Sequence, residues 1–121
     1  MKKIISITLA LLCFESMEAQ KITFFSPTVV RVEKTTDGQF AEKKSLVITA
    51  TPQKVAVSVK QADGKTVYRT NALTVTVDDK SQQVSFAKAD GTMLMTEGEF
   101  AFTPITEGID KGSYRVKQAF A

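Results

Sequence analysis

A strict two-residue alternation in the middle of the chain constrains the fold more than any other feature. Leu73, Val75 and Val77 occupy every second position, and threonines fill the positions between them. Successive side chains of a β-strand point to opposite faces, so this pattern is typical of a strand with one apolar face. Residues 84–86 repeat the pattern after a polar gap. The sequence therefore predicts a β-hairpin over residues 73–86.

Similar short runs occupy most of the remaining chain. Turn-forming dipeptides separate several of them, and the Asp63-Gly64 and Asp90-Gly91 pairs are the strongest because Asp-Gly readily adopts positive φ. No helical stripe appears after residue 20. About ten short strands with regular turn signals predict an all-β fold, an antiparallel β-sandwich. The other β-rich runs are residues 22–25, 29–33, 46–50, 55–59, 66–68, 93–95, 100–102 and 114–120.

The first residues have the three-part pattern of a secretory signal peptide. A basic start precedes the apolar run 4–14, and a polar stretch then ends at the small residue Ala19. The apolar run is too short for a permanent membrane span. We therefore expect a cleaved signal peptide over residues 1–19 and a single β-sandwich domain over residues 20–121, exported to the periplasm or the cell exterior.

Cys13 raises the alternative of a lipid anchor in the outer membrane. A lipidated cysteine directly follows a small residue, whereas the bulky Leu12 precedes Cys13, which disfavours this reading. Cys13 is also the single cysteine of the chain. The mature domain is therefore expected to lack disulfides, so that core packing alone holds it together.

Composition excludes several classes of function. The chain has no histidine, which removes Ser/His and Cys/His catalysis and most zinc sites. It has no tryptophan, the broad aromatic side chain that sugar-binding surfaces favour. The net charge is only +3 and the basic residues are scattered, so nucleic acid is not an expected partner. No cofactor or metal motif is present.

Two pairs of acidic residues could suggest chemistry. Glu97 and Glu99 are two positions apart, so on a regular strand they share one face, with their Cα atoms about 6.5 Å apart. A glycosidase acid/base pair must instead face each other across the sugar, so a solvated loop edge is the favoured interpretation. Asp78 and Asp79 lack further ligands and are interpreted as turn residues. We therefore predict no catalytic residue in this chain.

The aromatic residues are interpreted mainly as core. Phe24, Phe25, Phe100 and Phe102 could stack on sugar rings, but phenylalanines more often dominate packing in the interior. The tyrosines Tyr68 and Tyr114 are better candidates for a polar contact.

Three pieces of the chain, in this order, resemble one family. The first is SPTVVRV (26–32) followed by KSLVI (44–48); the second is LTVTV (73–77) through VSF (84–86) and DGTML (90–94); the third is YRVKQAF (114–120). Together they resemble the N-terminal galactose-mutarotase-like β-sandwich domain of glycoside hydrolase family 31, which contains bacterial α-glucosidases and α-xylosidases. The resemblance covers essentially all of residues 20–121.

This resemblance implies a partner and a role. In the family, the sandwich precedes a (β/α)8 barrel that carries two catalytic aspartates and hydrolyses α-glycosidic bonds with retention. None of that barrel is present here, so the chain is expected to be an N-terminal fragment of a longer enzyme, truncated before the barrel, and to act as a scaffold that is inactive alone. The family's sandwich packs on the barrel and can lend a loop to the rim of the sugar site, which implies a contact with an α-linked oligosaccharide. The alternative is an independent secreted β-sandwich for binding or adhesion.

The hairpin at residues 73–86 departs from the family in its turn. Family members often have a Thr-Gly pair where this chain has Ser81-Gln82. If positive φ is still required there, the side chain costs about 1 kcal/mol or more.

Overall fold

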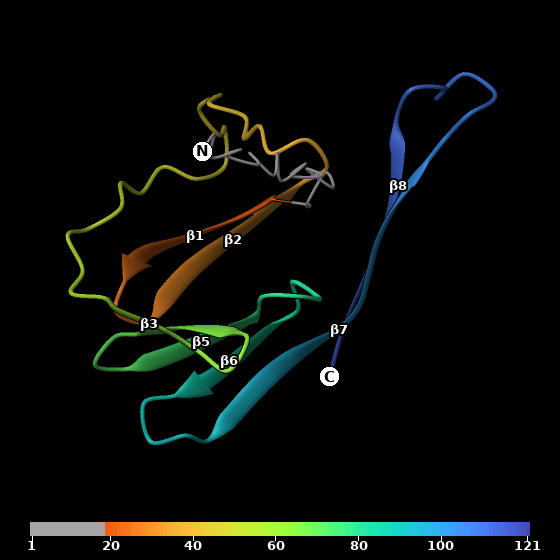
Figure 1. Cartoon of the computed structure of the whole chain (residues 1–121). Coiled ribbons are helices and arrows are strands. Elements are labelled where there is room, and N and C mark those ends of the chain that lie inside the picture. The colour runs from red at the N-terminus through yellow and green to blue at the C-terminus, as the bar shows by residue number, and fades with distance from the viewer. Residues whose placement is uncertain (1–18) are drawn as a thin grey trace, which may run out of the picture.

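The computed structural model describes residues 19–121, which form eight strands and contain no helix (Figure 1). Every strand pairs antiparallel with a neighbour. The predicted signal segment lies outside these residues except for Ala19, and the cleavage site stays a prediction. The strands are β1 (Ala19–Ser26), β2 (Val29–Thr35), β3 (Ser58–Ala62), β4 (Lys65–Arg69), β5 (Leu73–Asp78), β6 (Val84–Lys88), β7 (Met93–Pro104) and β8 (Tyr114–Phe120).

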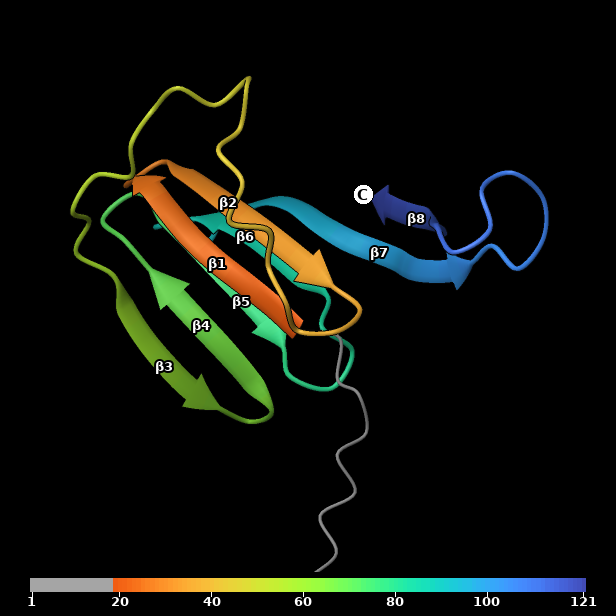
Figure 2. The same ribbon diagram turned by 90° about the horizontal axis from the view of Figure 1, so that it is seen from above.

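The strands form two sheets of unequal size. β1 and β2 make a two-stranded sheet, and the other six make a sheet in which the strands follow one another in chain order. The small sheet lies across one face of the large one, as Figure 2 shows from above. The predicted all-β antiparallel sandwich is therefore confirmed.

The core lies between the two sheets and is centred on β5. Its residues Leu73, Val75 and Val77 are buried, as the alternation predicted, and the threonines between them face away from the core. Phe24 of the small sheet and Val84 of β6 complete the buried cluster. Half-buried apolar side chains pack around it: Ile22, Val30, Val32, Val55, Val57, Tyr68 and Phe86.

The predicted Asp-Gly turns occur where expected. Asp63 and Gly64 have φ values of 54° and 70° and connect β3 to β4, while Gly91 has φ of 90° between β6 and β7. In the turn of the β5–β6 hairpin, Gln82 has φ of 60°. The expected positive φ is thus present on a non-glycine residue, which costs about 1–2 kcal/mol.

Gly64→Ala should destabilise the domain by about 1–2 kcal/mol, because a Cβ at this left-handed position strains the backbone. Nothing lies within 4 Å of the added Cβ, so the penalty would be purely conformational. Gly98→Ala is the matched control, because Gly98 lacks positive φ and its Cβ would meet Ala119 at an ordinary 3.8 Å. Urea unfolding of both variants checks this, and an equal loss in both would contradict the backbone explanation.

One predicted strand is absent and another begins later than predicted. Residues 46–50 form no strand, and of the alternating valines at 55, 57 and 59 only Val59 lies in one, because β3 begins at Ser58. Residues 41–52 instead cross the outer face of the small sheet, and the chain is tied to β1 where the Gln53 N–H donates to the Phe25 carbonyl oxygen at 3.0 Å. A strand needs a partner for its backbone groups, and residues 46–50 have no adjacent strand.

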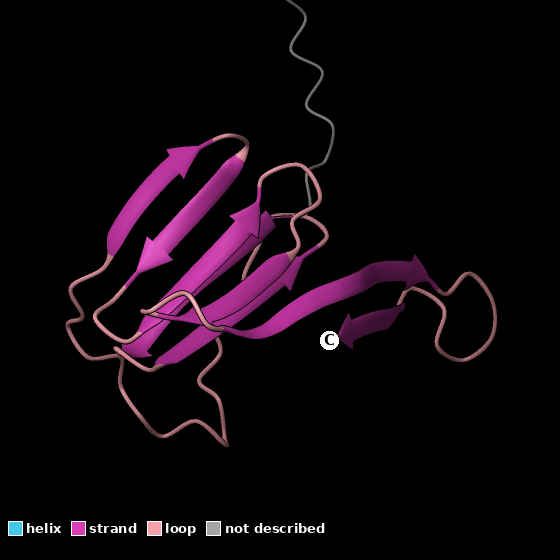
Figure 3. Cartoon of the chain, turned by 90° about the horizontal axis from the view of Figure 1, so that it is seen from below, coloured by secondary structure: helices cyan, strands magenta, loops and turns pink. Residues whose placement is uncertain are grey.

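The runs predicted at 93–95 and 100–102 belong to one strand, β7. Its first part pairs with β6 as far as Thr96, and its second part, from Glu97 onwards, pairs with β8. The second part, β8 and their connecting loop form an arm (residues 97–121) that projects beyond the sandwich (Figures 1 and 3). Every residue of β8 is exposed.

Candidate functional site

A buried ion pair joins the two sheets at the base of the arm. Lys34 of β2 and Glu97 of β7 lie 2.6 Å apart (Nζ to Oε2), and their side chains are 7% and 1% exposed. The alternation that turns Val30 and Val32 inward also turns Lys34 inward. Glu97 is the first residue of β7 that pairs with β8, since the residues up to Thr96 pair with β6. The β7–β8 register shifts between Glu97 and Phe100.

Each charged group has further partners. The carboxylate of Glu97 accepts the backbone N–H of Val84 at 3.1 Å and the side-chain amide of Gln118 at 2.8 Å. The Lys34 ammonium donates to the Gln82 carbonyl oxygen at 2.9 Å and lies 4.2 Å from the centre of the Phe100 ring. Buried charges are tolerated when they are paired and hydrogen-bonded in this way. The site therefore connects both sheets, the β5–β6 turn and the arm.

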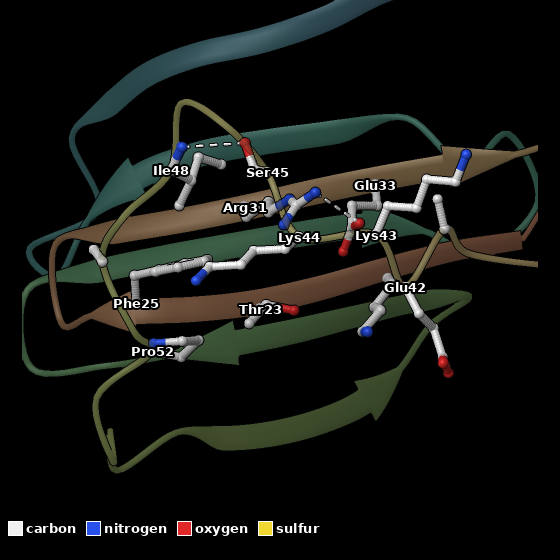
Figure 4. Close-up of a pocket in the computed structure, with 13 residues that line it drawn as sticks. Thr23, Phe25, Arg31, Glu33, Glu42, Lys43, Lys44, Ser45, Ile48 and Pro52 are labelled. Atoms are coloured by element: carbon white, nitrogen blue, oxygen red, sulfur yellow. Dashed lines mark hydrogen bonds and ion pairs between the residues drawn. The ribbon is translucent and has the colours of Figure 1, made fainter.

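An open groove lies on the outer face of the small sheet, beneath the segment 41–52 (Figure 4). Its volume is about 300 Å³, and within it Arg31 and Glu33 form an ion pair at 3.0 Å. Figure 4 shows Lys44 extending across the floor and the Ile48 N–H bonded to the Ser45 hydroxyl. The groove presents hydroxyl, ammonium and guanidinium donors beside the half-buried Phe25.

A comparison with protein families finds a match. The family of the glycosyl hydrolase 31 N-terminal galactose mutarotase-like domain matches residues 19–121, which is the whole of the described sandwich and arm. The chain belongs to this family. A comparison with curated proteins finds no match.

Within this family 31 N-terminal domain, Glu97 and Glu99 play unlike roles. The predicted solvated position is correct for Glu99, which is 62% exposed and pairs with Lys117 at 2.6 Å. It is wrong for Glu97, whose carboxylate is enclosed. The shared face expected from a regular strand is lost because of the register shift between Glu97 and Phe100. With its oxygens engaged by Lys34, Val84 and Gln118, Glu97 has no access to a substrate.

The acidic turn of the family 31 N-terminal domain agrees with its prediction. The carboxylate of Asp78 accepts the backbone N–H groups of Lys80 at 3.0 Å and Ser81 at 2.8 Å. These hydrogen bonds, chiefly those from Ser81, hold the pKa of Asp78 below its ordinary value. Asp79 accepts the Thr66 hydroxyl at 2.7 Å. Among residues 19–121, no group of three acidic, histidine or cysteine side chains could hold a metal ion.

The aromatic residues divide into three groups. Phe24 is core as predicted, and Tyr68 packs against the same cluster. The core prediction is wrong for Phe25, which points away from the core into the outer groove. Phe100 and Phe102 are only half-buried on the arm, where their rings meet edge to face at 4.9 Å, and Tyr114 lies 6.1 Å from Phe102. The prediction that Phe100 and Phe102 are core residues is therefore wrong, because both side chains are only partly buried.

Sequence reasoning missed Lys34. The signal was present, because Lys34 continues the two-residue alternation of Val30 and Val32 on the apolar face of its strand. A cation on such a face requires a buried partner, although the sequence does not say which one. Across residues 19–121, no helix is long and apolar enough to cross a lipid bilayer.

Proposed function

We propose that this chain is the non-catalytic N-terminal sandwich of an exported α-glycosidase. It serves as the scaffold on which a (β/α)8 barrel packs, and that barrel would hydrolyse α-glucosidic or α-xylosidic bonds. The observation that carries the proposal is the family match over all eight strands. The structural engagement of Glu97 supports it, because the carboxylate pair most suggestive of chemistry is not available for chemistry.

The isolated domain should not hydrolyse aryl α-glucosides or α-xylosides. The reason is that it lacks paired carboxylates facing a substrate, which retaining glycosidases require about 5–5.5 Å apart. The assay compares purified residues 20–121 with the complete polypeptide encoded by the reading frame. Hydrolysis by the domain alone would contradict the proposal. A reading frame without a barrel would favour an independent binding module instead.

Export of the domain forms part of the proposal and rests on the pattern of residues 1–19. Expression of the whole chain in a bacterium, followed by fractionation and N-terminal sequencing, tests it. Gln20 as the first residue of a periplasmic or secreted product is the expected result. A full-length cytoplasmic product would contradict it, and a lipid-modified Cys13 would indicate an outer-membrane anchor instead.

We also assign any sugar contact of the domain to the outer groove. Its support is the set of hydrogen-bond donors beside Phe25, which suits sugar hydroxyls. The test is an NMR titration of residues 20–121 with an α-linked glucose trisaccharide. Shifts confined to groove residues are expected, and shifts elsewhere or none at all would remove the oligosaccharide from the proposal.

A further inference from the structure

The inner face of the arm is not covered by the small sheet. Phe102 and Val116 are cross-strand partners on this face, and Phe100 and Gln118 are the next pair. Val116 is 55% exposed. Since the small sheet has only two strands, it ends at β2, and beyond β2 the arm lacks a second layer among the described residues (Figure 2).

The uncovered face borders the free edge of β2. A cavity of about 230 Å³ lies between them. β1 pairs with one side of β2, and no described strand pairs with the other side. The cavity is lined by Val32, Lys34, Phe100, Phe102, Val116 and Gln118.

We infer that an extended segment from elsewhere in the parent glycosidase polypeptide pairs with the free edge of β2 and covers the inner face of the arm. This inference rests on the proposed function, because that function supplies the longer polypeptide. The occupant is a β-strand whose alternate side chains are apolar. Its backbone satisfies the free N–H and C=O groups of β2, and its apolar side chains pack on Phe100, Phe102 and Val116.

The other edge of the small sheet supports a strand as the occupant. There, the chain already places an extended segment beside β1, with the Gln53 N–H bonded to the Phe25 carbonyl oxygen. Val55 and Val57 of that segment pack against the core cluster over the large sheet. The free edge of β2 and the arm present the same combination of a strand edge above an apolar sheet face, and no part of residues 19–121 occupies it.

A second copy of the chain does not fit this position. If two copies paired through their β2 strands, each would bring its own large sheet beneath the joined small sheets. The arm already lies in that layer next to β2 (Figure 2). A single strand needs no such space. A strand from the same polypeptide also has the advantage of a high effective concentration.

The Lys34–Glu97 pair holds the free edge of β2 at a set distance from the arm. It fixes β2 to the point where the arm leaves the large sheet, and Phe100 packs over the Lys34 ammonium. The free edge and the aromatic face are thus held at a set separation before the segment arrives, which lowers the ordering cost of its binding.

The test compares residues 20–121 with the complete polypeptide by hydrogen exchange and thiol modification, both read by mass spectrometry. The β2 amides that face its free edge should exchange at least tenfold more slowly in the complete polypeptide, whereas those of β3 should not change. The thiol of Val116→Cys should be alkylated at least tenfold more slowly. Lys117→Cys is the matched control, because Lys117 adjoins Val116 on the opposite face of the arm and is 64% exposed.

Unchanged exchange at β2 in an enzyme that contains the barrel would overturn the inference while leaving the proposed function intact. Equal protection of both thiols with unchanged β2 amides would also overturn it, since a packed surface rather than a strand would then cover the arm. A reading frame without a barrel would refute the proposed function and the inference with it.

Discussion

Glu97→Ala should lower the free energy of unfolding of residues 20–121 by about 3–5 kcal/mol, the usual cost of removing one partner of a buried ion pair. The loss is large because the Lys34 ammonium would stay buried without its counter-ion, and the Val84 N–H and Gln118 amide would lose their acceptor. Domains of this size are stable by only about 5–15 kcal/mol. Urea unfolding followed by circular dichroism measures the effect.

Glu99→Ala is the matched control, since it removes the same side chain two residues away. Its exposed pair with Lys117 should contribute no more than about 1 kcal/mol. If Glu97→Ala does not fold, the double variant Lys34→Met, Glu97→Leu keeps the test decisive, because removing both charges should restore most of the stability. Equal losses of unfolding free energy in Glu97→Ala and Glu99→Ala would refute the buried pair. A double variant that is no more stable than Glu97→Ala would also refute it.

Phe24→Ala should cost about 3–5 kcal/mol, the typical cost of removing a buried phenylalanine side chain. Phe24 is 8% exposed and is the apolar residue of the small sheet that belongs to the buried cluster with β5 and β6. Its loss would leave a cavity between the sheets, which the rigid backbone of two paired layers cannot fully close. Thermal unfolding by calorimetry gives the loss of stability.

Phe25→Ala tests whether burial, rather than aromatic character, causes the effect. Phe25 is the next residue on the same strand, but it faces the open outer groove and is only half-buried. About 1 kcal/mol is expected for its truncation, in proportion to the apolar area it removes from water. A larger loss at Phe25 than at Phe24 would mean that the main core lies on the outer face of the small sheet.

The features predicted correctly from the sequence are those decided by neighbouring residues. The alternation at Leu73, Val75 and Val77 identifies β5 and its buried face, because one strand carries the whole signal. Asp63-Gly64 locates the β3–β4 turn for the same reason, since its backbone preference is intrinsic to two residues.

The errors concern features that depend on distant partners. Residues 46–50 have the composition of a strand, but a strand forms only where another backbone lies beside it. Burial of Glu97 depends on Lys34, which is 63 positions away in the sequence. The division into a two-stranded and a six-stranded sheet depends on which strands pair, and the local pattern does not encode that pairing.

The chain-order arrangement of the large sheet has a consequence for the speed of folding. Each strand from β4 to β8 pairs with the one before it, so the sheet can assemble through successive hairpins that each form in about 1–10 μs. Docking of β1–β2 requires the closure of much longer loops and should follow. The Lys34–Glu97 contact belongs to this late docking, so we expect its loss mainly to speed unfolding rather than to slow folding. Stopped-flow chevrons of Glu97→Ala measure both rates. Slower folding with an unchanged unfolding rate would mean that the two sheets dock early.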